Sequence, residues 1–284
     1  MSNFRKSMRI CAIHLVCLCH DSRIILCVTT IFLLIVGKRT NDLRSFCVTL
    51  NVRATPFPLF VIITESLYNQ KLLLLLFLMI ICDAPFIDGA MVHYIQRTGR
   101  MNWFIGTLMY IITLVIGFWI IVFLACVVSI LNCFEWSIEW GKVFLSIMKT
   151  GEIPDLIGTV RYIKIGSALK AFVICFCFKC LLTMLLAFIT WLTNANTRKN
   201  YGVILPIILV MLHGHIVGWF VNSDWVYFSP VSLSNLNMLN IDGITKLPSV
   251  RYAVVFLTSV NLLAGYMLYR TSMRFSIETG NLVN

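Results

Sequence analysis

The hydrophobic residues of this chain gather in long runs that are separated by short polar stretches. Crossing about 30 Å of hydrocarbon takes about 20 helical residues, and six segments approach that length. They are 18–37, 66–82, 103–131, 168–192, 202–221 and 252–269. The segment 103–131 gives the clearest signal, because it carries no charged residue. The pattern therefore predicts an all-α polytopic membrane protein, with six transmembrane helices in a single transmembrane domain (residues 1–284).

Three further stretches are too short or too polar to be predicted as spans. "TPFPLFVIIT" at 55–64 is apolar, and its two prolines favour an interfacial or re-entrant piece. Residues 1–17 mix basic and apolar side chains, which is typical of an amphipathic helix lying in the membrane plane. "EWSIEW" at 135–140 would form one acidic and one aromatic face on a helix, which suits the membrane interface.

Composition excludes a soluble domain. The chain is 59% hydrophobic and only 12% charged, whereas soluble domains carry about 25% charged residues. The net charge of +11 is spread along the chain. The basic residues form no stripe with interleaved aromatics, so we expect contact with anionic lipid and no nucleic-acid partner.

Six spans place both chain ends on one side of the membrane. The basic residues of both terminal segments favour the cytoplasm for that side. This arrangement also places the loops 83–102 and 196–200 inside; the loop 196–200 is net basic, whereas 83–102 balances two aspartates with two arginines. Basic residues also follow the first span and precede the fourth, on the opposite side, so the charge bias is weak. On the basis of the terminal segments we expect a multi-pass protein of the cell membrane with both termini cytoplasmic.

Catalytic signatures are missing from the sequence. It contains no phosphate-binding G-x-x-x-x-G-K-[ST] loop, no H-E-x-x-H and no G-x-S-x-G. Most of the 11 cysteines lie in apolar runs, where a small hydrophobic role is the simpler interpretation. Cys177 and Cys180 have C-x-x-C spacing, but no second pair matches it. The sequence predicts a non-enzyme with no catalytic residue and no metal site.

Three polar residues inside the predicted spans are candidates for a transport pathway or a polar interior. Lys179 lies deep in the fourth span, so we expect it to face the interior or a cavity. His213 and His215 point about 200° apart on a helix and cannot jointly bind one metal from it. Packing against polar partners is the favoured interpretation for both histidines, and a role in proton or substrate movement is the alternative.

The loop between the second and third predicted spans is a polar stretch with an apolar run on either side. Asp83 and Pro85 are expected to end the second span, because proline disfavours helix at the residue before it. The following residues offer an apolar edge that Arg97 and Arg100 close. This pattern predicts a short amphipathic helix that lies flat on the cytoplasmic face and is tied to two spans.

"DAPFID…YIQRTGRMNWFIG", a long apolar span and then "EWGKVFLSIMKTG" resemble permease subunits of ABC-2 type transporters from Gram-positive bacteria. The resemblance covers residues 60–150, and the rest of the chain is similar by hydropathy. It implies that the loop after the second span carries a coupling helix, which docks in a groove of a separate ATPase subunit. The coupling positions that it implies are Asp83, Pro85, Phe86, Asp88, Arg97, Thr98, Gly99 and Arg100.

The resulting expectation is a permease subunit of an ATP-driven exporter. This chain would bind no cofactor itself, and ATP and Mg²⁺ would be held by the ATPase partner. A second permease subunit, the same chain or a different one, and membrane lipid complete the expected partners. The few charges within the spans favour an amphipathic or hydrophobic cargo such as an antimicrobial peptide, a lipid or a drug. The alternative is a protein without an ATPase partner: a stand-alone immunity or sensor protein, a secondary transporter or an intramembrane enzyme.

Overall fold

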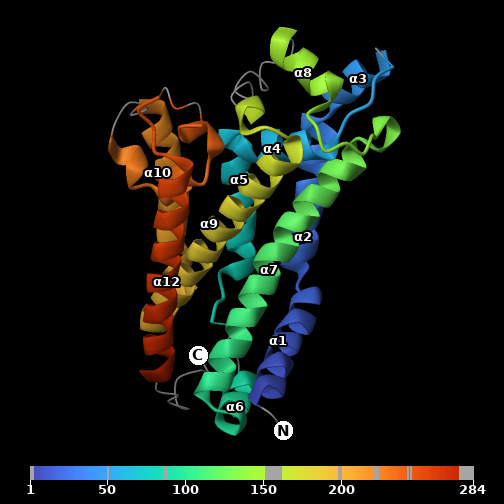
Figure 1. Ribbon diagram of the computed structural model, residues 1–284. Coiled ribbons are helices and arrows are strands. Elements are labelled where there is room, and N and C mark those ends of the chain that lie inside the picture. The colour runs from blue at the N-terminus through green and yellow to red at the C-terminus, as the bar shows by residue number, and fades with distance from the viewer. Residues whose placement is uncertain are drawn as a thin grey trace.

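The computed structural model describes residues 3–49, 51–85, 89–150, 162–197, 200–219, 224–241, 243 and 245–274. Within these residues the protein is all-α, with two isolated β-bridges and no strand. The longer helices are α1 (Asn3–Cys19), α2 (Ser22–Phe32), α3 (Asn41–Thr49), α4 (Pro56–Glu65), α5 (Leu67–Ile81), α6 (Gly89–Thr98), α7 (Arg100–Ser129), α8 (Gly141–Thr150), α9 (Ala168–Thr197), α10 (Ile204–Trp219) and α12 (Val250–Arg274). The shorter elements are one π-helix, η1 (Leu33–Arg39), and one short α-helix, α11 (Pro230–Leu233). The others are the 3-10 helices η2 (Leu131–Cys133), η4 (Asn200–Val203), η5 (Asp224–Tyr227) and η6 (Leu236–Met238). Figure 1 shows the long helices side by side in an elongated bundle.

Three helices, α7, α9 and α12, are each long and apolar enough to cross a membrane. Two further pairs pass the same test only when joined across a bend. The first pair is α1 with the helix from Ser22 to Gly37, bent by 67°, and the second is α4 with α5, bent by 85°. The described residues thus contain three to five candidate spans, which is compatible with a membrane protein.

The prediction of six spans is not confirmed. The segment 18–37 begins at the end of α1 and includes the break before α2, so it is not one straight helix. The segment 202–221 contains α10, whose apolar part within the described residues, Tyr201–His213, is too short to cross. The remaining four predicted segments coincide with α5, α7, α9 and α12, with ends that differ by a few residues.

The helix α4 lies inside the bundle with every one of its residues buried. Its sequence is apolar on all sides up to Thr64, and a helix of that kind is stable only where other elements surround it. Phe60 is fully buried and contacts Trp119 of α7 and Phe172 of α9, with ring centroids 6.4 and 5.0 Å away. The stretch 55–64 is therefore part of a broken or re-entrant segment, and the interfacial alternative does not fit.

The helix α1 runs alongside the first half of α7, in the same direction (Figure 1). Gly106 makes this close approach feasible, because a Cβ there would lie 2.7 Å from the carbonyl oxygen of Ser7 and 2.8 Å from Cβ of Ile10. His14 and Tyr110 extend the contact, with ring centroids 5.2 Å apart. We expected an amphipathic helix in the membrane plane here, and the structure instead packs α1 lengthwise against a candidate span.

The segment after α7 is also different from its prediction. Residues 134–140 form no helix, so the expected acidic and aromatic faces do not exist. Trp136 is exposed, whereas Trp140 is buried and its indole N–H donates to the carbonyl oxygen of Gly166 at 2.6 Å. This segment, α3 and α8 lie at one end of the bundle, and α6 lies at the other with the start of α1 and the end of α12 (Figure 1).

Candidate functional site

The break between α4 and α5 places a carboxylate in the middle of the bundle. Ser66 leaves the helical conformation, with φ −65° and ψ 125°, so that Glu65 ends α4 and α5 starts in a new direction. The side chain of Glu65 is 1% exposed. An ionised carboxylate at such a position needs a charged partner and hydrogen bonds, because a bare buried charge is very unfavourable.

Lys179, in the middle of α9, supplies the opposite charge. Its Nζ lies 2.9 Å from Oε1 of Glu65, and the lysine side chain is 0% exposed. The ammonium group also donates to the carbonyl oxygen of Ser234 at 3.1 Å. Lys179 therefore lies in the interior of the bundle, as the sequence predicted.

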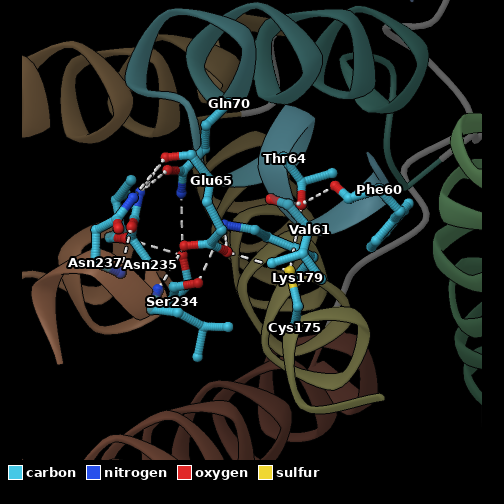
Figure 2. A network of polar contacts seen from close by, with 12 residues as sticks. Phe60, Val61, Thr64, Glu65, Gln70, Cys175, Lys179, Ser234, Asn235 and Asn237 are labelled. Atoms are coloured by element: carbon cyan, nitrogen blue, oxygen red, sulfur yellow. Dashed lines mark hydrogen bonds and ion pairs between the residues drawn. The ribbon is translucent and has the colours of Figure 1, made fainter. Parts of the chain in front are cut away.

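Backbone and side-chain donors occupy the remaining acceptors of Glu65 (Figure 2). The backbone N–H of Leu236 donates to Oε2, and the thiol of Cys175 donates to Oε1 at 3.1 Å. At the helix break the carbonyl oxygen of Glu65 accepts from Nδ2 of Asn235 at 3.1 Å. The carboxylate is thus held by one charge and two hydrogen bonds in addition.

Gln70, in the first turns of α5, closes the network against the segment that follows α11. Its Oε1 accepts from Nδ2 of Asn235 at 2.7 Å, and its Nε2 donates to the hydroxyl of Ser234 at 3.2 Å. Figure 2 shows these side chains pointing toward one another from α4, α5, α9 and the segment between α11 and η6. We call Glu65, Gln70, Lys179, Ser234 and Asn235 the central polar cluster.

The central polar cluster is not explained by stability alone. A buried ion pair is often no more stabilising than apolar residues of similar volume, but removing one partner costs about 3–5 kcal/mol. Ionisable residues within membrane-spanning bundles generally face the interior and mark transport pathways. Broken helices also occur at membrane depth where their freed backbone groups find partners in the protein. Among the described residues, no group of three or more His, Cys, Asp or Glu side chains could hold a metal.

His213 of α10 is buried near this region. Its Nδ1 lies 3.0 Å from the hydroxyl of Ser232 in α11, while its Nε2 is buried without a hydrogen-bond partner. We expected His213 to pack against a polar partner, and Ser232 is such a partner. The side chain of His215 lies outside the described part of the structure.

The predicted coupling loop begins at the other end of α5. Asp83 follows this helix, and its Oδ2 lies 2.5 Å from Nη1 of Arg23 in α2. Both side chains are a little over one third exposed. Asn194 of α9 holds the same turn, because its Nδ2 donates to the carbonyl oxygens of Cys82 at 2.9 Å and Ala84 at 2.6 Å.

The amphipathic helix predicted within this loop is α6. Val92 and Ile95 are buried, whereas Arg97 is exposed. Gly99 joins α6 to α7 at φ +85°, a conformation that favours glycine. Arg100 points away from α6, since its Nη1 donates to the carbonyl oxygen of Met273 at the end of α12, at 2.9 Å.

Those predicted coupling residues that the structure describes face different neighbours. Asp83 faces α2, Arg100 faces α12, and Arg97 is exposed on α6. Pro85 is partly buried in the turn after α5, and the hydroxyl of Thr98 donates to the carbonyl oxygen of Tyr94 one turn earlier, at 2.6 Å. Phe86 and Asp88 lie outside the described residues.

Sequence reasoning missed Glu65 and its partners. Glu65 was assigned to no span, because it lies between the apolar stretch 55–64 and the predicted second span. A carboxylate with apolar runs on both sides is a usable signal, since it leaves little room for the side chain to reach water. The partners at 234–237 carry no comparable signal, because short runs of Ser and Asn are typical of exposed loops.

No family model, curated protein or solved structure matches this chain. The resemblance to ABC-2 permeases thus has no support from these comparisons, and the functional argument depends on the chain's own residues.

Proposed function

We propose that this chain is the membrane-spanning permease subunit of an exporter that a separate ATPase subunit energises. The observation that carries the proposal is α6. It is a short amphipathic helix between the broken span α4–α5 and the long span α7, at the end of the bundle where α1 begins and α12 ends.

The exposure pattern of α6 supports a docking role. Its buried residues Val92 and Ile95 hold it against the bundle, which leaves His93, Tyr94, Gln96 and Arg97 exposed. A basic, rigidly held helix suits an acidic or polar groove of a partner better than it suits the membrane interior. In this arrangement ATP and Mg²⁺ are bound by the partner, and closure of two ATPase subunits pushes on α6.

The proposed topology has six crossings. They are α7, α9, α12, α10 and the two bent helix pairs, each pair counted as one crossing. Both termini and α6 then lie in the cytoplasm, and the partner permease, the same chain or a different one, packs beside this bundle. The mostly apolar outer faces favour an amphipathic or hydrophobic cargo such as an antimicrobial peptide, a lipid or a drug.

A second candidate, a secondary transporter without an ATPase partner, is favoured by the central polar cluster. Buried ionisable residues beside a broken helix are frequent in transporters that couple substrate movement to ions. The two candidates differ in whether a nucleotide-hydrolysing partner binds α6.

The test is affinity purification of the tagged full-length chain from its native membranes, with an ATPase encoded beside its gene as the expected partner. Arg97→Glu reverses an exposed charge on α6, and Arg251→Glu reverses an exposed charge at the opposite end of the bundle. We expect the first variant to lose at least tenfold of the bound ATPase and its stimulated hydrolysis, and the second to retain both. Equal retention in the two variants, or no ATPase in the wild-type preparation, would overturn the proposal in favour of a protein that acts alone.

The side of the membrane is tested separately, by a membrane-impermeant maleimide on intact cells with peptide mass spectrometry. Gln96→Cys on α6 should react only after the cells are permeabilised. Ile138→Cys, which is 54% exposed at the opposite end in the wild type, should react in intact cells. Labelling of position 96 from outside would place α6 on the wrong face for a cytoplasmic partner.

A further inference from the structure

The helix α5 is fixed by polar contacts at both of its ends. It has 15 residues, which corresponds to about 22 Å at 1.5 Å per residue. One end carries the central polar cluster, and the other end leads into α6 (Figure 1). Along the chain, α5 therefore links the buried ion pair to the proposed docking helix, with residues 82–88 between α5 and α6.

At its start, α5 is bonded to two different parts of the bundle. Glu65, two residues before the helix, is paired with Lys179 of α9. Gln70 exchanges hydrogen bonds with Ser234 and Asn235, in the segment that follows α11. All five side chains are buried, so water does not replace these bonds when the partners separate.

At its other end, the turn that follows α5 is bonded to α2 and again to α9. Arg23 of α2 pairs with Asp83, and its Nη1 also donates to Sγ of Cys82 at 3.0 Å. Asn194 of α9 binds the carbonyl oxygens of Cys82 and Ala84. The turn that leads toward α6 is therefore positioned by α2 and α9.

Between these ends the buried contacts of α5 are mainly apolar, from Leu73, Leu74, Phe77 and Leu78. Apolar contact is non-directional, so it tolerates a small axial shift of the helix. Hydrogen bonds and ion pairs are directional and weaken steeply when their geometry changes. An axial movement of α5 would therefore be resisted chiefly at its two ends.

We propose that α5 couples the central polar cluster to α6, so that the intact Glu65–Lys179 pair determines how firmly α6 is held. The inference extends the proposed function, because it gives the docking helix a regulator inside the bundle. The coupling itself is a property of this chain alone and can be measured with no ATPase present.

The experiment is hydrogen–deuterium exchange on the full-length chain in lipid nanodiscs, read by mass spectrometry. Glu65→Gln keeps the shape of the side chain and removes its charge, which leaves Lys179 without a counter-ion. We expect amides at 67–70 and at 92–98 to exchange at least tenfold faster than in the wild type. Faster exchange at 67–70 with unchanged exchange at 92–98 would overturn the coupling.

Thr183→Val is the matched control on the same helix as Lys179. It removes a buried hydroxyl that accepts from Nε1 of Trp119 at 3.2 Å and donates to the carbonyl oxygen of Lys179 at 2.8 Å, while both charges of the ion pair stay in place. We expect wild-type exchange at 92–98 in this variant. Acceleration equal to that of Glu65→Gln would show general loosening of the bundle and would overturn the proposal.

If Glu65→Gln does not fold, the double variant Glu65→Leu/Lys179→Met replaces it, because it leaves no unpaired charge. The expected result is again faster exchange at 92–98, and wild-type exchange there would overturn the coupling. These outcomes are independent of ATPase binding. If exchange at 92–98 is faster but Arg97→Glu does not reduce ATPase binding, only the proposed function is refuted. If Arg97→Glu reduces ATPase binding but exchange at 92–98 is unchanged, only the coupling is refuted.

Discussion

The two ends of α5 contain the same kind of contact in different surroundings. At the start, Nζ of Lys179 lies 2.9 Å from Glu65, with side-chain exposures of 0% and 1%. At the exit, Nη1 of Arg23 lies 2.5 Å from Asp83, with exposures of 38% and 39%. The shorter distance belongs to the more exposed pair, so distance alone does not rank the two.

Access to solvent determines what each pair does. Where both side chains reach a polar environment, either charge can be solvated when the other is removed, and the contribution of the pair is small. In the central polar cluster neither group has that alternative, so each depends on the other. The buried end should therefore tolerate loss of both charges better than loss of one, and the exit end should be insensitive to either change.

Lys179→Met should have the largest effect, because it leaves the Glu65 carboxylate buried with no counter-charge. We expect the free energy of unfolding to fall by about 3–5 kcal/mol, measured by denaturation in mixed detergent micelles. The double variant Glu65→Leu/Lys179→Met should be more stable than this single variant, because it leaves the Leu236 N–H and the Ser234 carbonyl oxygen unpaired but buries no lone charge. A single variant as stable as the double would mean that the pair is solvated after all.

Asn194→Ala should have the next largest effect, since it removes one side chain that serves three backbone groups. The carbonyl oxygens of Cys82 and Ala84 lose their donor, and the N–H of Gly202 loses its acceptor at 2.6 Å. A buried group left unsatisfied costs about 1–3 kcal/mol, and the bond to Cys82 is only part-buried, so we expect a total loss of about 2–3 kcal/mol. Asn194→Asp keeps an acceptor for Gly202 but places a buried carboxylate against the two carbonyl oxygens, so it should lose at least as much stability, and a smaller loss in the same unfolding assay would contradict these contacts.

Gly106→Ala tests whether the exit end depends on α1, the helix that leads into α2 and Arg23. The added Cβ would overlap Ser7 and Ile10, so we expect a loss of about 1–3 kcal/mol from overpacking. Gly117→Ala on the same helix meets nothing within 4 Å. It should be neutral or slightly stabilising, because alanine favours helix over glycine. Equal changes in the free energy of unfolding for the two substitutions would show that the close approach of α1 to α7 does not contribute to stability.

Arg23→Gln should have the smallest effect, at most about 1 kcal/mol, because the pair with Asp83 is partly exposed. Screening by salt should reduce this difference further. The measurement is the free energy of unfolding at about 0.05 and 1 M salt. A loss as large as that of Lys179→Met would remove the contrast between the two ends of α5.

The sequence predicted local features well and contacts between distant segments poorly. Unbroken apolar runs predicted α7 and α9, and the polar loop at 83–102 predicted α6. Lys179 was expected in the interior because a charge in an apolar run has few other places to lie. Its partner was not predicted, since nothing in the local pattern connects Glu65 with a lysine in another helix.

The other wrong predictions have a similar physical origin. An amphipathic pattern in residues 1–17 fits a helix in the membrane plane and a helix packed on a neighbour equally well. The small side chain of Gly106 favours the second arrangement here, because it allows the α1 backbone to come within contact distance. The spacing of "EWSIEW" fits a helix, but the chain forms none there, and Trp140 is buried with its N–H bonded to Gly166.

By itself the sequence determined that this protein is built from long apolar helices, because an apolar run of about 20 residues fits a helix, which satisfies its own backbone hydrogen bonds, better than a strand. It also determined that a short amphipathic helix, α6, lies between two of these apolar helices, α5 and α7. Only the tertiary structure decided where α4 turns into α5, and that Glu65, Lys179 and Asn235 meet there. The physical reason is that burial is specified by the residue types along one segment, whereas the pairing of polar groups depends on which segments pack together.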